Sequence, residues 1–240
     1  MMGLVLSRRA RLGLAAVFAG ALLVLLPMRV AFGLMSLDRY GISARAVNGS
    51  LWWGRIVQLG VGEMPLGTVD ASLSPARLLI GQAHIGISRQ AGQADDIRGA
   101  LRAGVGGIGV DGITGSLPLG AAAAPLPISA VELTQLSARF AGGTCAEAEG
   151  QVRARVSGDV AGLNLSQGLA GVARCDGEAL LLPLVGQSGM EKLNVRIMAD
   201  GRYVADLRVA TDDADLAGSL ERQGFVRAGN DLMIRIEGLL

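Results

Sequence analysis

Aromatic side chains are scarce in this chain of 240 residues, and histidine is almost absent. Phe, Trp and Tyr together make up 3% of the residues, and His84 is the single histidine. With one histidine, no G-x-S-x-G elbow and no C-x-x-C spacing, the sequence offers neither a Ser-His-Asp hydrolase nor a zinc site. Few aromatics beside 36 glycines also argue against a helical bundle, because glycine weakens helix interiors and suits turns and closely approaching strands.

A basic surface is missing as well. The formal net charge is +1, but from Gly41 onward 17 basic residues stand against 20 acidic ones, a net charge of −3. No basic stripe with interleaved aromatics is present, so nucleic acid is not an expected partner. The basic residues that stand apart are Arg8, Arg9 and Arg11 at the N-terminus, with no acid near them.

An uncharged apolar run, Leu12 to Met28, follows these arginines. A helix of ~20 apolar residues crosses a bilayer, and the apolar stretch from Val30 to Leu37 extends the run. Arginines before the run place the N-terminus in the cytoplasm by the positive-inside rule. We therefore expect a single-pass protein of a bacterial inner membrane, with a cytoplasmic segment at 1–11, a transmembrane anchor at 12–32 and a periplasmic domain at 33–240.

A cleaved signal peptide and a buried core helix are the alternative interpretations of the run. A signal peptide has a shorter apolar centre and ends in an A-x-A-like site. The nearest candidate here, Ala31-Phe32-Gly33, is a poor match. Cleavage would deliver the same domain to the same compartment.

Beyond Tyr40, apolar residues alternate with polar or small ones, which predicts strands with one buried face. The clearest stretches are 57–61, 69–73, 85–87, 152–156, 193–197, 203–209 and 232–236. Turn signals lie between them, among them Asn48-Gly49, Asp111-Gly112, Asp176-Gly177 and Asp200-Gly201. Such short turns favour antiparallel neighbours over crossover units.

Two short helical segments interrupt the alternation. One is expected at 75–80, where Ser74 can cap the helix and Gly81 can end it, and the other at 216–223. The predicted fold is mainly β: an N-terminal transmembrane helix followed by a curved, mostly antiparallel sheet, either sandwich-like or an open half-barrel.

Cys145 and Cys175 are the only cysteines. In an exported domain an even pair is usually a disulfide, since the periplasm oxidises thiols. We therefore predict a bond between them, with free thiols as the alternative.

Three other patterns predict no chemistry. The stretch from Gly104 to Gly109 matches G-x-G-x-x-G, but the sequence after it is rich in glycine and cannot open the helix that a dinucleotide site needs. The acidic groups at Asp95-Asp96 and Asp212–Asp215 lie in turn-like stretches without the glycine and distal glutamate of a calcium loop. His84 has no evident catalytic partner, so we expect a surface or groove-facing strand residue.

Both tryptophans of the chain stand side by side in a glycine-bounded stretch soon after the apolar run. The stretch reads Val47-Asn48-Gly49-Ser50-Leu51-Trp52-Trp53-Gly54-Arg55. Side chains of adjacent strand residues point to opposite faces. We therefore expect one tryptophan to pack inward and the other to face the membrane interface or a partner, with two ordinary packed tryptophans as the alternative.

This stretch, together with a P-x-x-L-L-x-G-like element further on, resembles the type II secretion system protein N family. The residues that match are Gly49, Leu51, Trp52, Gly54, Pro75, Leu78, Leu79 and Gly81. Similarity continues in the C-terminal half, for example at Cys175-Asp176-Gly177 and Leu182-Pro183-Leu184, and is poorest over 91–127.

The resemblance implies an accessory, non-enzymatic inner-membrane component of the machinery that exports folded proteins across the outer membrane, without a cofactor. Its partners would be other proteins of that machinery, in the inner-membrane platform or the outer-membrane secretin, and the region of Trp52 and Trp53 would be the contact surface. The family also looks related to proteins with AsmA-like curled sheets. A lipid-binding or lipid-shuttling groove is therefore the alternative function.

Overall fold

The computed structural model describes residues 14, 27–34, 42–61, 64–89, 96–119, 128–156 and 167–239. Arg8, Arg9, Arg11 and most of the predicted anchor lie outside these residues. Among the described helices, none has the length and apolar character needed to cross a bilayer. The helix that follows the apolar run, α2 (Met28–Leu34), has seven residues.

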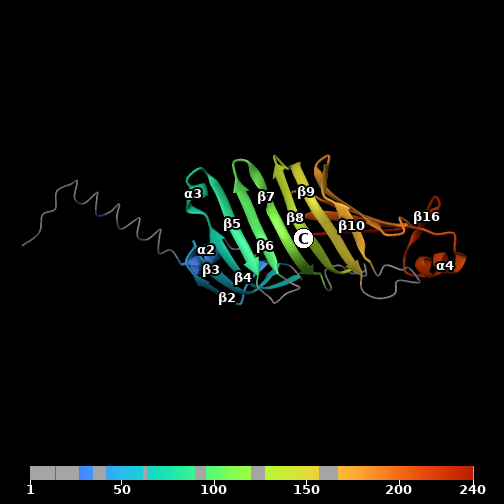
Figure 1. Ribbon diagram of the computed structural model, residues 1–240, viewed down its shortest axis with the longest axis horizontal. Helices are drawn as coiled ribbons and strands as arrows, with labels where there is room; N and C mark the ends of the chain where they lie inside the picture. The colour runs from blue at the N-terminus through green and yellow to red at the C-terminus, as the bar shows by residue number, and fades with distance from the viewer. Residues whose placement is uncertain are drawn as a thin grey trace, which may run out of the picture.

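The described residues form sixteen strands that belong to one sheet (Figure 1). In chain order they are β1 (Ile42–Ser43), β2 (Ala46–Gly49), β3 (Gly54–Val61), β4 (Met64–Leu73), β5 (Gln82–Arg89), β6 (Ile97–Gly104), β7 (Gly107–Pro118), β8 (Ile128–Ala141), β9 (Thr144–Val156), β10 (Leu169–Val172), β11 (Arg174–Asp176), β12 (Ala179–Gly186), β13 (Glu191–Ile197), β14 (Arg202–Ala210), β15 (Val226–Ala228) and β16 (Asp231–Leu239). Two further helices are α3 (Pro75–Leu78) and α4 (Ala214–Arg222).

The sheet is an antiparallel meander. From β3 to β10 each strand pairs with the next one along the chain, and the order continues through β12, β13, β14 and β16 to β15. All pairings between the described strands are antiparallel, as short connections require. The predicted mainly β, open antiparallel sheet is thereby confirmed.

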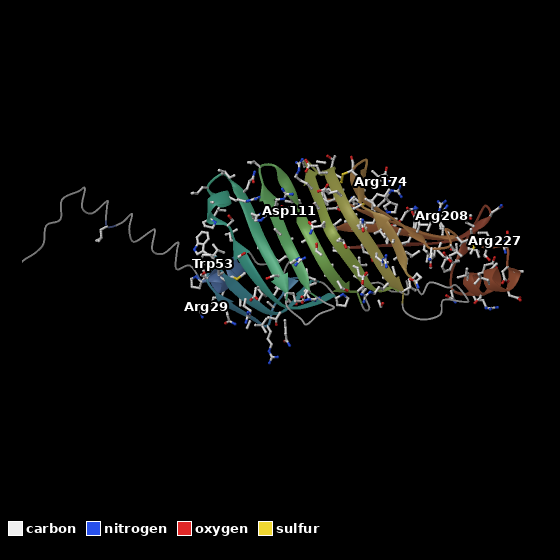
Figure 2. The ribbon with its side chains drawn as sticks, in the orientation of Figure 1. Arg29, Trp53, Asp111, Arg174, Arg208 and Arg227 are labelled. Atoms are coloured by element: carbon white, nitrogen blue, oxygen red, sulfur yellow. A yellow bond between two sulfur atoms is a disulfide. The ribbon has the colours of Figure 1, made fainter. Side chains whose placement is uncertain are left out.

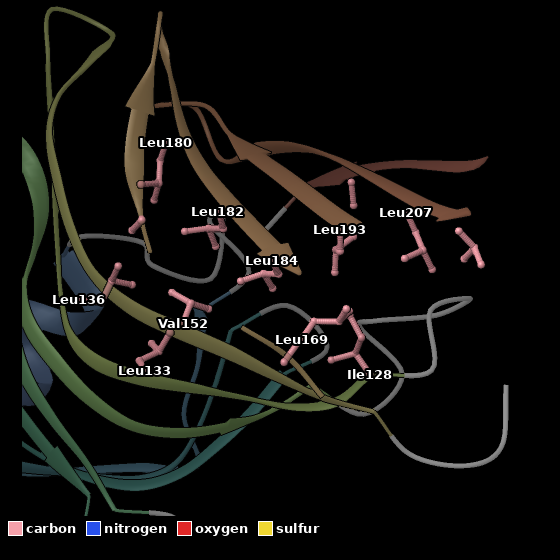
Figure 3. Packing of buried hydrophobic residues seen from close by; sticks show 14 of the residues in the cluster. Ile128, Leu133, Leu136, Val152, Leu169, Leu180, Leu182, Leu184, Leu193 and Leu207 are labelled. Carbon is pink, nitrogen blue, oxygen red and sulfur yellow. The ribbon is translucent and has the colours of Figure 1, made fainter. Parts of the chain in front are cut away.

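The C-terminal half of the sheet folds back over the middle strands. Figure 3 shows Leu182, Leu184 and Leu193 on one layer pointing toward Leu133 and Val152 on the other. The alternation of the sequence supplies these residues, because every second side chain of β12, β13 and β14 faces inward. Leu193 keeps only 1% of its surface exposed, and burying a leucine in this way stabilises a fold by about 1.5–3 kcal/mol.

The disulfide lies where the sheet folds back. Strand β10 pairs with both β9 and β12, whereas β11, directly after it, pairs with β12. Cys145 at the start of β9 is bonded to Cys175 in β11, with Cα atoms 5.5 Å apart. The bond therefore joins the two layers at the point where they separate, and the predicted pairing of the two cysteines is present.

The opposite face of the sheet carries cross-strand ion pairs. Arginines and carboxylates at paired or diagonal positions join neighbouring strands: Arg55–Asp70, Arg102–Asp111, Arg139–Glu147, Arg155–Glu132 and Arg235–Asp206. Each contributes about 0.2–1 kcal/mol. A slip by one residue would turn these charges into the core, so the pairs also help to fix the register.

Three local predictions differ from the structure. The turn expected at Asp111-Gly112 is a register shift inside β7, because the extra residues are absorbed as a bulge against β8. Ser74 is extended before α3 but makes no side-chain capping bond. Helix α4 begins before 216, since the Asp213 carboxylate accepts the backbone N–H groups of Asp215 and Leu216 and caps the helix there.

Candidate interaction surface

The two tryptophans lie in the reversal between β2 and β3, and not within a strand as predicted. The N–H of Ser50 donates to the Trp53 carbonyl at 3.0 Å, and the Trp53 N–H donates to the Ser50 hydroxyl at 3.2 Å. These bonds close the reversal and turn Trp53 outward. Trp53 is 76% exposed, and Trp52 is half-buried. One tryptophan thus faces outward, although a turn rather than strand alternation puts it there.

Both glycines that bound this reversal are required by its geometry. Gly49 has φ +92°, and a Cβ atom there would lie 2.5 Å from the Trp53 carbonyl oxygen. Gly54 is covered by the side chain of Met28, so a Cβ atom there would collide with the methionine sulfur. These contacts give a physical reason for two of the glycines that carry the family resemblance.

The chain after the apolar run is seated on the sheet at the same place. Pro27 forms a bridge with Ser50, and α2 lies against β2 (Figure 1). Met28 packs on the small apolar cluster of Ile56, Val69 and Ala71. The last residues of the predicted anchor are therefore joined to the sheet without a linker, beside Trp53 (Figure 2).

A polar groove of about 890 Å³ extends from Trp53 across the neighbouring strands. Its floor is a row of directly paired positions, Arg55, Asp70, Ser88 and Arg98, on β3 to β6. The Arg55 guanidinium donates two hydrogen bonds to the Asp70 carboxylate, at 2.6 and 3.2 Å. These bonds lower the pKa of Asp70 and raise the pKa of Arg55. The groove thus offers charged and hydroxyl groups, which suit a polar protein surface.

The second part of the family pattern lies at the same end of the sheet. Gly54 pairs with Ala71, and β4 ends two residues later and leads into α3. The structure therefore brings Pro75 and its neighbours close to the tryptophan reversal, as Figure 1 shows for α2 and α3. Leu79 is 90% exposed and Leu78 is exposed as well, so these leucines are not core residues.

His84 lies on β5 next to α3. Its Nδ1 atom is 3.5 Å from the Arg77 guanidinium. Burial and the positive charge of Arg77 lower the pKa of the imidazole, so it is neutral at pH 7. An arginine neighbour cannot orient a general base as a carboxylate does.

The remaining sequence patterns occupy structural positions. The residues from Gly104 to Gly109 form the hairpin between β6 and β7, which has no helix after it. Asp213 caps α4, and Asp95 lies outside the described residues. No group of three or more metal-ligating side chains occurs in the described part of the chain.

Two buried charges were not foreseen from the sequence. The Arg89 guanidinium is buried and donates to the carbonyls of Leu66 and Ser116, both at 2.9 Å, so it ties β4 to β7. The Asp206 side chain is 7% exposed and accepts two hydrogen bonds from Arg235. These hydrogen bonds lower the pKa of Asp206. Sequence alternation alone places both residues at strand positions and gives no signal of their burial.

The interior limits where a lipid could bind. Between β8–β10 and β12–β16 the space is filled by buried side chains, as Figure 3 shows for Leu136, Leu169 and Leu207. An acyl chain would have to displace this core. The groove beside Trp53 lies on the polar face of the sheet.

The structure thus defines an all-β protein built as one folded-over meander, whose candidate site is an exposed surface. A comparison with protein families identifies it further: the family model of type II secretion system (T2SS), protein N, matches residues 40–235. The chain belongs to this family. No curated protein and no solved structure matches it.

Proposed function

We propose that the protein is an accessory, non-enzymatic component of the type II secretion machinery, held in the inner membrane by the apolar run at 12–32. The observation that carries the proposal is the family match over 40–235, because that span includes the tryptophan reversal, the groove and both layers of the sheet. In this proposal the N-terminus is cytoplasmic and the β domain works in the periplasm.

The proposed contact surface is the groove beside Trp53. Its open shape and its row of Arg55, Asp70, Ser88 and Arg98 suit a partner that presents polar and charged side chains. The partner would be a protein of the inner-membrane platform or the outer-membrane secretin.

Site-specific photo-crosslinking in secreting cells tests this surface. A photoreactive amino acid replaces Ser88 in the groove, and a matched control replaces Lys192, which is equally exposed on the polar face of the distant strand β13. We expect Ser88 to capture a platform or secretin protein and Lys192 to capture none. Equal yields at both positions, or capture of no secretion protein at Ser88, would contradict the proposal.

A further inference from the structure

Apolar side chains are exposed together at the end of the sheet that carries α3. Leu79 is 90% exposed and Val105, at the tip of the β6–β7 hairpin, is 92% exposed. The two segments touch, because Gln82 pairs with Gly104 and a Cβ atom on Gly104 would lie 2.5 Å from the Gly81 carbonyl oxygen. We call this the apolar end; its exposed members are Trp53, Leu78, Leu79, Ile80, Val105 and Ile108.

The apolar end lies where the uncharged run joins the sheet. Pro27 bridges to Ser50, three residues before Trp53, and Met28 is seated on Gly54. A run that lies in a bilayer would therefore hold this end within a few residues of the lipid surface. The opposite edge of the sheet, formed by β15, is separated from it by the whole strand order (Figure 1).

The residue types at this end are those that favour a membrane interface. Tryptophan combines an apolar ring with an N–H donor and is enriched at the headgroup level of bilayers. Arg29 and Arg77 are exposed beside the apolar residues, and neither forms an ion pair with a described carboxylate. Long cationic side chains next to apolar ones suit anionic headgroups above acyl chains.

We infer that the apolar end docks on the surface of the bilayer, with Leu79 and Val105 inserted below the headgroups and Arg77 among them. The inference rests on the membrane anchoring in the proposed function and goes beyond it, since it fixes how the β domain sits on the membrane. It leaves the polar groove beside Trp53 at the rim of the docked end, accessible to a protein.

Fluorescence quenching by brominated lipid tests the docking on the full chain. Trp52 and Trp53 are the only tryptophans, so replacing both with Phe gives a background without tryptophan, whose fold is checked by circular dichroism. Single reporters are then introduced as Leu79→Trp, Val105→Trp or, as the exposed control on β15, Val226→Trp. The proteins are reconstituted in phosphatidylcholine and phosphatidylglycerol vesicles brominated near the glycerol end of the acyl chains.

We expect several-fold stronger quenching at Leu79→Trp and Val105→Trp than at Val226→Trp. A fourth reporter, Phe18→Trp in the apolar run, tests the anchor separately. Strong quenching at Phe18→Trp together with equal, weak quenching at the other three positions would overturn the docking and leave the anchor intact. Absence of quenching at Phe18→Trp would overturn the anchor and the docking with it. Shielding of Leu79→Trp from a soluble quencher without quenching by lipid would overturn the docking in favour of a protein cover.

Discussion

Removal of the disulfide is the perturbation whose effect can be worked out most directly. The bond closes a loop with a sequence separation of 30 between Cys145 and Cys175. In the chain-entropy account, a closed loop of this length stabilises the folded state by about 3.6 kcal/mol. For a domain of roughly 200 residues, in which 1 kcal/mol shifts the melting temperature by about 2–4 °C, the expected decrease is about 7–14 °C.

Differential scanning calorimetry of the oxidised and the reduced wild type measures this decrease. Reduced wild type is the appropriate comparison because it keeps both sulfur atoms, and Cys145 is packed in the core. The double variant Cys145→Ala, Cys175→Ala then adds the loss of that packing as a separate, smaller step. A reduced protein that melts within about 2 °C of the oxidised one would refute the loop-closure reasoning.

The same bond reports the compartment of the domain. Thiols stay reduced in the cytosol and become oxidised in the periplasm. In cells grown without reductant, we expect both cysteines to react with a maleimide only after denaturation and reduction. Labelling of the denatured protein before any reduction would contradict the proposed periplasmic location.

Three further predictions concern the core, the tryptophan reversal and the buried carboxylate. Leu193→Ala should lower the free energy of unfolding by about 2–5 kcal/mol, measured by urea titration, whereas the exposed Val226→Ala should change it by less than about 0.5 kcal/mol. Gly54→Val should displace Met28 and expose the chain before it, so limited proteolysis should cut the variant near α2 faster than wild type, and a wild-type cutting rate would contradict the close packing. Because the pKa of Asp206 is lowered from 3.8 in the folded state, its pair with Arg235 stabilises the fold above that pH and is lost as the pH falls below it. Asp206→Asn should therefore lose less stability than wild type between pH 5 and 3, and an unchanged acid dependence would count against the pair.

Much of the architecture follows from local patterns. Alternation of apolar residues fixes which side chains face inward, and short turn signals fix antiparallel neighbours, so strands such as β13 and β14 are predictable residue by residue. The place where the sheet folds back is not predictable in this way. Alternation specifies a face but says nothing about curvature, which depends on the split of β10 and β11 between two partner strands.

The candidate surface was only partly accessible to sequence reasoning. The glycines beside Trp53 mark a special backbone, but a strand and a reversal are both consistent with them until the contact of Gly54 with Met28 is known. Leucines such as Leu79 look like core residues in a sequence, because hydrophobicity does not reveal whether anything covers a side chain. Its exposure emerges only from the fold.

The strand order bears on how the protein is made. Since strands pair with near neighbours along the chain, each hairpin can form soon after its residues leave the ribosome or a translocation pore, without waiting for distant segments. The apolar face of β8 and β9, however, stays uncovered until β12 to β14 have emerged. For that interval the nascent sheet presents a leucine-rich surface to its surroundings, and this intermediate is where a periplasmic chaperone would act on the protein.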